Sequence, residues 1–139
     1  TLTSAYYRGS QGVILTYDIT SAESFSEIPR WLDEVNQLCR SDVVKLLVGN
    51  KLDLVVGNTG RGLKREVQFE DGENYAADKG MVFLEASAKD GENVDLAFIQ
   101  VVRHIVANKD LLKGAETKKK GGGVTVSPSE DNRPESGCC

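Results

Sequence analysis

The sequence lacks the features that mark several large classes of protein. No apolar run approaches the roughly 18 residues that a bilayer-spanning helix needs, and the start of the chain has no secretory or transit segment. The chain has three cysteines, two of them adjacent at its end, which argues against a disulfide framework and favours a reducing compartment. The net charge of −4 argues against a nucleic-acid binder held by phosphate contacts.

What the sequence does contain is a soluble globular body followed by a different tail. Of its 139 residues, 40% are apolar and 27% are charged, as in ordinary soluble domains. Beyond residue 110 come the runs Lys118–Lys120 and Gly121–Gly123 and a polar stretch without apolar periodicity. Such a tail buries too little apolar surface to offset the entropy of ordering. We therefore predict one folded region over residues 1–110 and a disordered tail over residues 111–139.

Short apolar runs in the folded region predict three β-strands. They are Gly12–Tyr17, Val43–Val48 and Met81–Glu85. Two of the three are nearly continuous in apolar residues, which is typical of strands covered on both faces in a parallel sheet.

Apolar residues at helical spacing predict three helices between and after these strands. The first helix has its apolar face on Ile28, Trp31, Leu32, Val35, Leu38 and Cys39. The second runs over Phe69–Lys79, with Gly80 as its C-terminal stop. The third is marked by Val94, Ala97, Phe98, Val101 and Ile105. The order β-α-β-α-β-α predicts an α/β fold with a parallel sheet.

Distinctive polar residues follow the second and third predicted strands. Ligands of open parallel sheets bind beyond the carboxyl ends of the strands, where the chain has Asn50-Lys51-Leu52-Asp53 and Ser87-Ala88-Lys89. Asp53 can accept two side-by-side hydrogen bonds from the N1–H and the 2-amino group of guanine, a pair of donors that adenine does not present. A wrong base would leave this carboxylate unpaired, which makes the selection strong.

The neighbouring residues supply complementary groups. Asn50 can both donate and accept, and the apolar stems of Lys51 and Lys89 can sandwich the two faces of a base. Backbone N–H groups around Ala88 can donate to a carbonyl oxygen on the base, and Ser87 can orient the Asp53 carboxylate. The alternative is an ordinary polar turn, because a motif as short as Asn-Lys-x-Asp also occurs by chance. Two such loops, each closing a strand of one sheet, favour the guanine site.

These loops resemble the two guanine-specificity motifs of Ras-superfamily GTPases. The segments Thr3–Gly9 and Gly12–Thr20 and the terminal Cys138-Cys139 resemble the Rab subfamily. The resemblance implies a parallel-sheet P-loop GTPase fold, of which this chain would hold the C-terminal β-α-β-α-β-α half and the tail. It also implies a GTP-binding and GTP-hydrolysing switch that regulates vesicle trafficking, with GTP or GDP as ligand and Mg²⁺ in the complete protein.

The same resemblance implies roles and partners. The residues that would hold guanine are Asn50, Lys51, Asp53, Ser87, Ala88 and Lys89. Tyr6 would match an aromatic residue of the second switch that faces effectors, and the alternative is a tyrosine that only packs its helix. The expected partners are exchange factors, GTPase-activating proteins, effectors, an escort protein and a GDP-dissociation inhibitor.

Several elements of the family are missing. The chain has no Gly-x-x-x-x-Gly-Lys-Ser/Thr loop, so it lacks the family's phosphate cradle, Mg²⁺ ligands and catalytic residues. We therefore expect a fragment of a longer protein, inactive by itself, in which the strand Gly12–Tyr17 presents an open edge that promotes aggregation. The segment Leu54–Lys64 is several residues longer than is usual in Rab proteins, and we interpret it as a surface insertion.

The end of the chain predicts a membrane anchor. Adjacent cysteines form a strained disulfide, so we expect Cys138 and Cys139 to be modified, and by resemblance both would be geranylgeranylated. Two lipid chains anchor a protein stably, whereas one gives only marginal binding. The expected location is the cytoplasmic face of an intracellular or plasma membrane, with cycling through the cytosol. The segment Lys109–Lys120 either adds attraction to anionic lipids or is a solvated linker.

Two alternative interpretations assign the chain to other classes of protein. A short, non-catalytic Rab-like module would contact regulators without cycling nucleotide, and the sequence encoded upstream of Thr1 would separate it from a fragment of a GTPase. A flavodoxin-like or receiver domain is disfavoured, because the paired loops at Asn50–Asp53 and Ser87–Lys89 have no role in such a domain.

Overall fold

The fold is an α/β arrangement in a computed structural model that describes residues 3–55, 62–110 and 113. The elements, in chain order, are α1 (Thr3–Tyr7), β1 (Gly12–Asp18), α2 (Ala22–Ser26), α3 (Ile28–Leu38), β2 (Val44–Asn50), the 3₁₀ helix η1 (Leu52–Leu54), α4 (Phe69–Asp78), β3 (Val82–Glu85) and α5 (Val94–Ala107). The predicted strands and the three longer helices are confirmed to within a few residues at each end.

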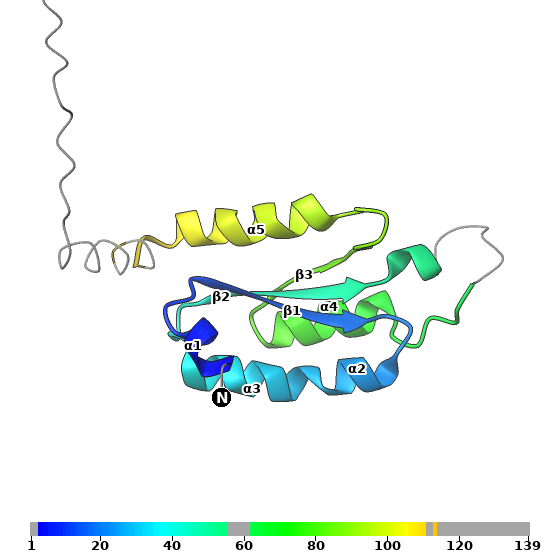
Figure 1. Cartoon of the computed structure of the whole chain (residues 1–139), viewed down its shortest axis with the longest axis horizontal. Coiled ribbons are helices and arrows are strands. Elements are labelled where there is room, and N and C mark those ends of the chain that lie inside the picture. The colour runs from blue at the N-terminus through cyan, green and yellow to red at the C-terminus, as the bar shows by residue number, and fades with distance from the viewer. Residues whose placement is uncertain (1–2, 56–61, 111–112, 114–139) are drawn as a thin grey trace, which may run out of the picture.

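The three strands form one parallel sheet in the order β1-β2-β3. Asp18 lies opposite Asn50 in the register of β1 with β2, and Gly49 lies opposite Glu85 in the register of β2 with β3. The carboxyl ends of all three strands therefore meet at one edge of the sheet (Figure 1). Among the described residues β1 pairs only with β2.

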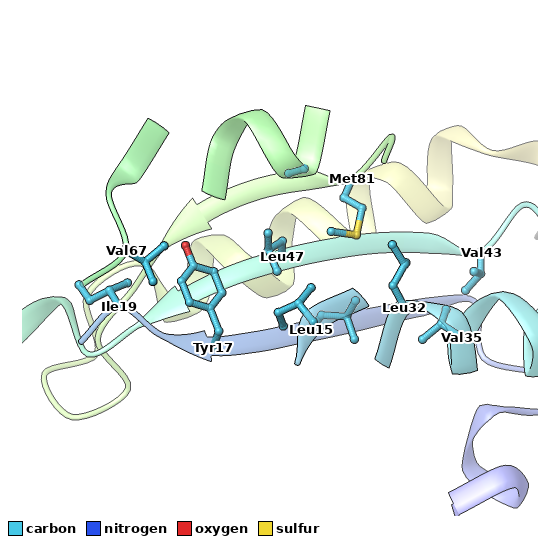
Figure 2. Packing of buried hydrophobic residues seen from close by; sticks show 11 residues of the cluster. Leu15, Tyr17, Ile19, Leu32, Val35, Val43, Leu47, Val67 and Met81 are labelled. Atoms are coloured by element: carbon cyan, nitrogen blue, oxygen red, sulfur yellow. The ribbon is translucent and has the colours of Figure 1, made fainter. Parts of the chain in front are cut away.

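Helices cover both faces of the sheet. Helix α5 lies alone on one face, while α2, α3 and α4 lie on the other (Figure 1). The larger apolar core lies beneath α2, α3 and α4, and its buried residues include Leu15, Tyr17, Ile19, Leu47 and Val35 (Figure 2). A smaller cluster beneath α5 consists of Leu46, Val48, Leu84, Ala86 and Ala97. The central strand β2 contributes buried residues to both clusters, Leu47 to the larger and Leu46 and Val48 to the smaller.

The predicted apolar helix faces were wrong for two residues, Trp31 and Phe98. On α3 the buried line is Ile28, Leu32 and Val35, whereas Trp31 is 37% exposed and carries the Arg30 guanidinium 5.1 Å from its ring centroid. On α5 Ala97 faces the sheet and Phe98 is 60% exposed. Each residue lies next to the buried line, and one step along a helix turns a side chain by about 100°.

Helix α2 was not predicted from the periodicity of the sequence. Ser21 is its N-cap, and the Ser21 hydroxyl accepts a hydrogen bond from the backbone N–H of Ser24 at 3.3 Å. The helix has five residues and none of them is fully buried, so it lacks the apolar repeat on which a prediction depends. Gly80, in contrast, ends α4 as predicted and has φ of +67°.

The close approach of α4 to the sheet depends on Gly72. A Cβ atom at this position would clash with the Tyr17 hydroxyl and lie 2.6 Å from Cζ of Phe83. We expect Gly72→Ala to lower the free energy of unfolding by about 1–3 kcal/mol, because overpacking outweighs the gain in helix propensity. Urea denaturation measures the change. Asn74→Ala on the exposed side of α4 is the control, and an equal effect of both variants would contradict the packing argument.

Candidate base-binding site

The candidate site lies where β2 and β3 end. Asn50 is the last residue of β2, Asp53 lies in η1, and Ser87 follows β3. Two backbone hydrogen bonds join the loops, from Ala86 N to Gly49 O at 2.8 Å and from Leu52 N to Ala86 O at 3.1 Å. The loops that the sequence places 34 residues apart are therefore one rigid unit.

Ser87 is the centre of this unit. Its side chain is fully buried, and its hydroxyl donates to Oδ1 of Asp53 at 2.7 Å and accepts from the backbone N–H of Asp90 at 3.1 Å. Its backbone N–H donates to Glu92 O at 2.9 Å, and its carbonyl accepts from Gly91 N at 2.8 Å. Ser87 thus shapes its own loop and orients the Asp53 carboxylate through one of its oxygens.

Asn50 makes the second link between the loops. Its side-chain oxygen accepts a hydrogen bond from the backbone N–H of Ala88 at 3.0 Å. This contact assigns the oxygen to the loop and leaves the NH₂ group of Asn50 as a donor for a ligand.

These residues surround an open hollow of about 320 Å³, which is near the lower end of the roughly 300–1,000 Å³ typical of small-molecule sites. Its lining consists of Asn50, Lys51, Asp53, Leu54, Ala88 and Lys89. Five of the six predicted guanine contacts line it, and the sixth, Ser87, lies buried beneath it. The lining thus combines an oriented carboxylate acceptor, an amide donor and two long side chains.

Sequence reasoning missed Asp18, which lies at the end of β1. Its Oδ2 atom is 2.7 Å from the Lys51 ammonium, and its Oδ1 accepts from the N–H and the hydroxyl of Thr20 at 2.8 and 2.7 Å. Burial disfavours the charged form of Asp18, yet the hydrogen bonds from Lys51 and Thr20 outweigh burial and hold the pKa of this carboxyl below its usual range. The available signal was the strand-end position of Asp18, shared with Asn50 and Glu85.

Sequence reasoning also missed a contact at the end of β3. The Arg65 guanidinium forms a two-pronged ion pair with Glu85, with N–O distances of 2.5 and 2.9 Å, and also donates to Val67 O at 3.0 Å. Glu85 is 6% exposed. Hydrogen bonding to Glu85 raises the pKa of Arg65 above its ordinary value. The pair ties the chain that enters α4 to the end of β3.

The remaining predicted site residues lie elsewhere. Tyr6 is in α1 and is 80% exposed, and its role toward effectors stays a prediction. Cys138 and Cys139 lie outside the described residues, as does most of the tail 111–139. The predicted insertion Leu54–Lys64 is described only at its two ends, 54–55 and 62–64.

Comparison with known proteins agrees with this architecture. The model of the Ras family matches residues 1–107. GTP-binding protein YPT1 of Saccharomyces cerevisiae is 38% identical over 142 residues, covering 100% of this chain and 66% of the relative. Rab11A of Lotus japonicus is 40% identical over 128 residues, covering 91% and 54%, and Rab-8A of Bos taurus is 39% identical over 134 residues, covering 96% and 61%. The chain therefore belongs to the Ras family, among its Rab-type GTPases, and it spans between 54% and 66% of the length of these relatives.

The hydrogen bond from Ser87 to Asp53 should contribute measurably to the free energy of unfolding. We expect Ser87→Ala to lower the free energy of unfolding by about 1.5–3 kcal/mol, the range for a hydrogen bond to a charged group. In an Asp53→Ala background the same substitution should cost less, because its partner is already gone. Thermal or urea denaturation measures both. Ser26→Ala, an exposed serine, is the control, and equal costs in the two backgrounds would contradict the coupling.

Proposed function

We propose that this chain supplies the base-reading half of the nucleotide site in a Rab-type switch that binds and hydrolyses GTP and regulates vesicle trafficking. The observation that carries the proposal is the Asp53 carboxylate, held at the mouth of the hollow by buried Ser87. The proposal draws further support from relatives named as Rab proteins and as a GTP-binding protein.

Selection of guanine rests on the fixed carboxylate. Asp53 offers an acceptor to the N1–H and the 2-amino group of guanine, and adenine has neither donor in that arrangement. Because Ser87 already holds one oxygen, the carboxylate pays little entropy to adopt the binding orientation. The NH₂ group of Asn50 and the backbone N–H groups near Ala88 remain for acceptor atoms of the base.

The two lysines act on the faces of the base rather than on its edge. Lys51 and Lys89 are exposed at the rim of the hollow, and the apolar stem of a lysine can cover a flat ring while its ammonium stays in water. Leu54 adds an apolar surface to the same lining.

Hydrolysis needs groups that the described residues do not provide. In this class of reaction Mg²⁺ and fixed cations neutralise the charge on the phosphates. Within residues 3–55, 62–110 and 113, no cluster of three or more His, Cys, Asp or Glu side chains could hold a metal ion. The contribution that we propose for this chain is to hold the base and so to fix the position of the nucleotide.

The proposal extends to partners and to the membrane. Exchange factors, GTPase-activating proteins, effectors, an escort protein and a GDP-dissociation inhibitor are the partners that a Rab-type switch implies, with exposed Tyr6 as an effector contact. No helix in the described part of the chain is long and apolar enough to span a bilayer. We propose that lipids on Cys138 and Cys139 attach the protein to the cytoplasmic face of an intracellular or plasma membrane.

Calorimetric titration tests base selection. In the full-length gene product that carries this chain, we expect tight binding of GDP, no detectable binding of ADP, and a loss of at least about tenfold in GDP affinity for Asp53→Ala, as for a charged hydrogen bond. Asp90→Ala, an exposed acid on the neighbouring loop, is the matched control and should bind like the wild type. A folded protein that binds no guanine nucleotide would favour the non-catalytic Rab-like module instead.

Membrane fractionation tests the anchor. We expect Cys138→Ser with Cys139→Ser to move the protein from the membrane to the soluble fraction, and either single variant to give weak, reversible binding, since one lipid chain is marginal. Cys39→Ser, at a partly buried cysteine that ends α3, is the control. Unchanged membrane binding in the double variant would contradict lipidation at these residues.

A further inference from the structure

The contact between Asp18 and Lys51 joins β1 to the base-binding hollow. The distance from Oδ2 of Asp18 to Nζ of Lys51 is 2.7 Å, with the Asp18 side chain 21% exposed and the Lys51 side chain 50% exposed. Asp18 does not line the hollow, whereas Lys51 does. The side chain of Asp18 therefore reaches the lining of the hollow through its ion pair with Lys51.

The Asp18 carboxylate is held before any ligand arrives. Oδ1 accepts two hydrogen bonds from Thr20, at 2.8 Å from its backbone N–H and 2.7 Å from its hydroxyl. The backbone N–H of Asp18 donates to the Ser24 hydroxyl at 2.9 Å. The two carboxylate oxygens thus have separate tasks: Oδ1 fixes the group to its own turn, and Oδ2 is directed at the lysine.

The other end of the Lys51 side chain is fixed by its backbone. Lys51 has φ of 73° and ψ of 32°, the left-handed conformation that residues other than glycine rarely adopt. With the Cα–Cβ bond set by the backbone and the ammonium set by Asp18, the stem of Lys51 is constrained at both ends.

We propose that Asp18 is a positioning residue of the base-binding site, which holds the ammonium of Lys51 so that the lysine stem forms a preformed wall against one face of the bound base. The proposal rests on the proposed function of the hollow. It assigns a task to the end of β1, which offers no group to the lining of the hollow itself.

A wall against the face of a base differs from a group that reads its edge. The stem of Lys51 covers the ring and does not distinguish guanine from hypoxanthine, which lacks only the 2-amino group. Asp53 reads that amino group. Loss of Asp18 should therefore weaken the binding of GDP and of IDP by the same factor, whereas loss of Asp53 should weaken the binding of GDP more than that of IDP.

The test is a double-variant cycle in the full-length gene product, read as dissociation rates of GDP and IDP in stopped-flow experiments. We expect Asp18→Asn and Lys51→Met each to raise both rates by about two- to fivefold, the factor for a partly exposed ion pair. The double variant should be no faster than either single variant, since Asp18 acts through the ammonium that Lys51→Met removes. Asp42→Asn, which breaks the ion pair with Arg40 at the opposite end of the strands, is the matched control and should leave both rates unchanged.

Three outcomes would overturn the proposal. They are unchanged rates in Asp18→Asn, an equally large effect of Asp18→Asn in the Lys51→Met background, and unequal factors for GDP and IDP. Should Asp18→Asn lower the Tm more than Asp42→Asn does, the Lys51→Met background decides, because a merely structural loss would raise the rates there as well. Failure of the underlying function gives a different result, since Asp53→Ala would then leave GDP affinity unchanged.

Discussion

The parallel pairing of β1, β2 and β3 in register is the constraint on which the other features depend. It brings Asp18, Asn50 and Glu85 to one edge of the sheet, and each of these residues then makes a contact that no local segment could make. The site is therefore a property of the sheet rather than of either loop. Hydrogen bonds between backbone groups fix the loops, and side chains add to a frame that already exists.

The buried polar side chains at this edge of the sheet are paired. Ser87 is fully buried and its hydroxyl has partners both as a donor and as an acceptor, and Glu85 is buried with both oxygens paired to Arg65. Polar groups away from water are costly unless they are paired. The bond from Ser87 orients the Asp53 carboxylate in the lining of the hollow before a ligand binds, so less entropy is lost on binding.

Much of the fold followed from the sequence because strands and long helices leave periodic patterns. The end of α4 at Gly80 and the gathering of Asn50, Asp53 and Ser87 could be predicted from local residues and one rule about parallel sheets. The pairs Asp18–Lys51 and Arg65–Glu85 could not, because charged residues 33 and 20 positions apart leave no periodic signal. Trp31 and Phe98 were wrongly placed on the buried faces of their helices, because periodicity indicates which side of a helix is apolar but not where the buried area ends. Large side chains at that boundary stay partly in water.

The separation of 34 residues between Asp53 and Ser87 has a thermodynamic consequence. The two side chains meet only when β2 and β3 are paired, so an unfolded chain has no site at all. A ligand of the hollow would then bind the native state alone, and folding and binding would share one equilibrium. By mass action, a ligand present at about 100 times its Kd adds about 2.7 kcal/mol to the stability of such a protein. A nucleotide bound in the hollow would in this sense be a structural component of the domain, and its departure would remove this stability from the loops around it.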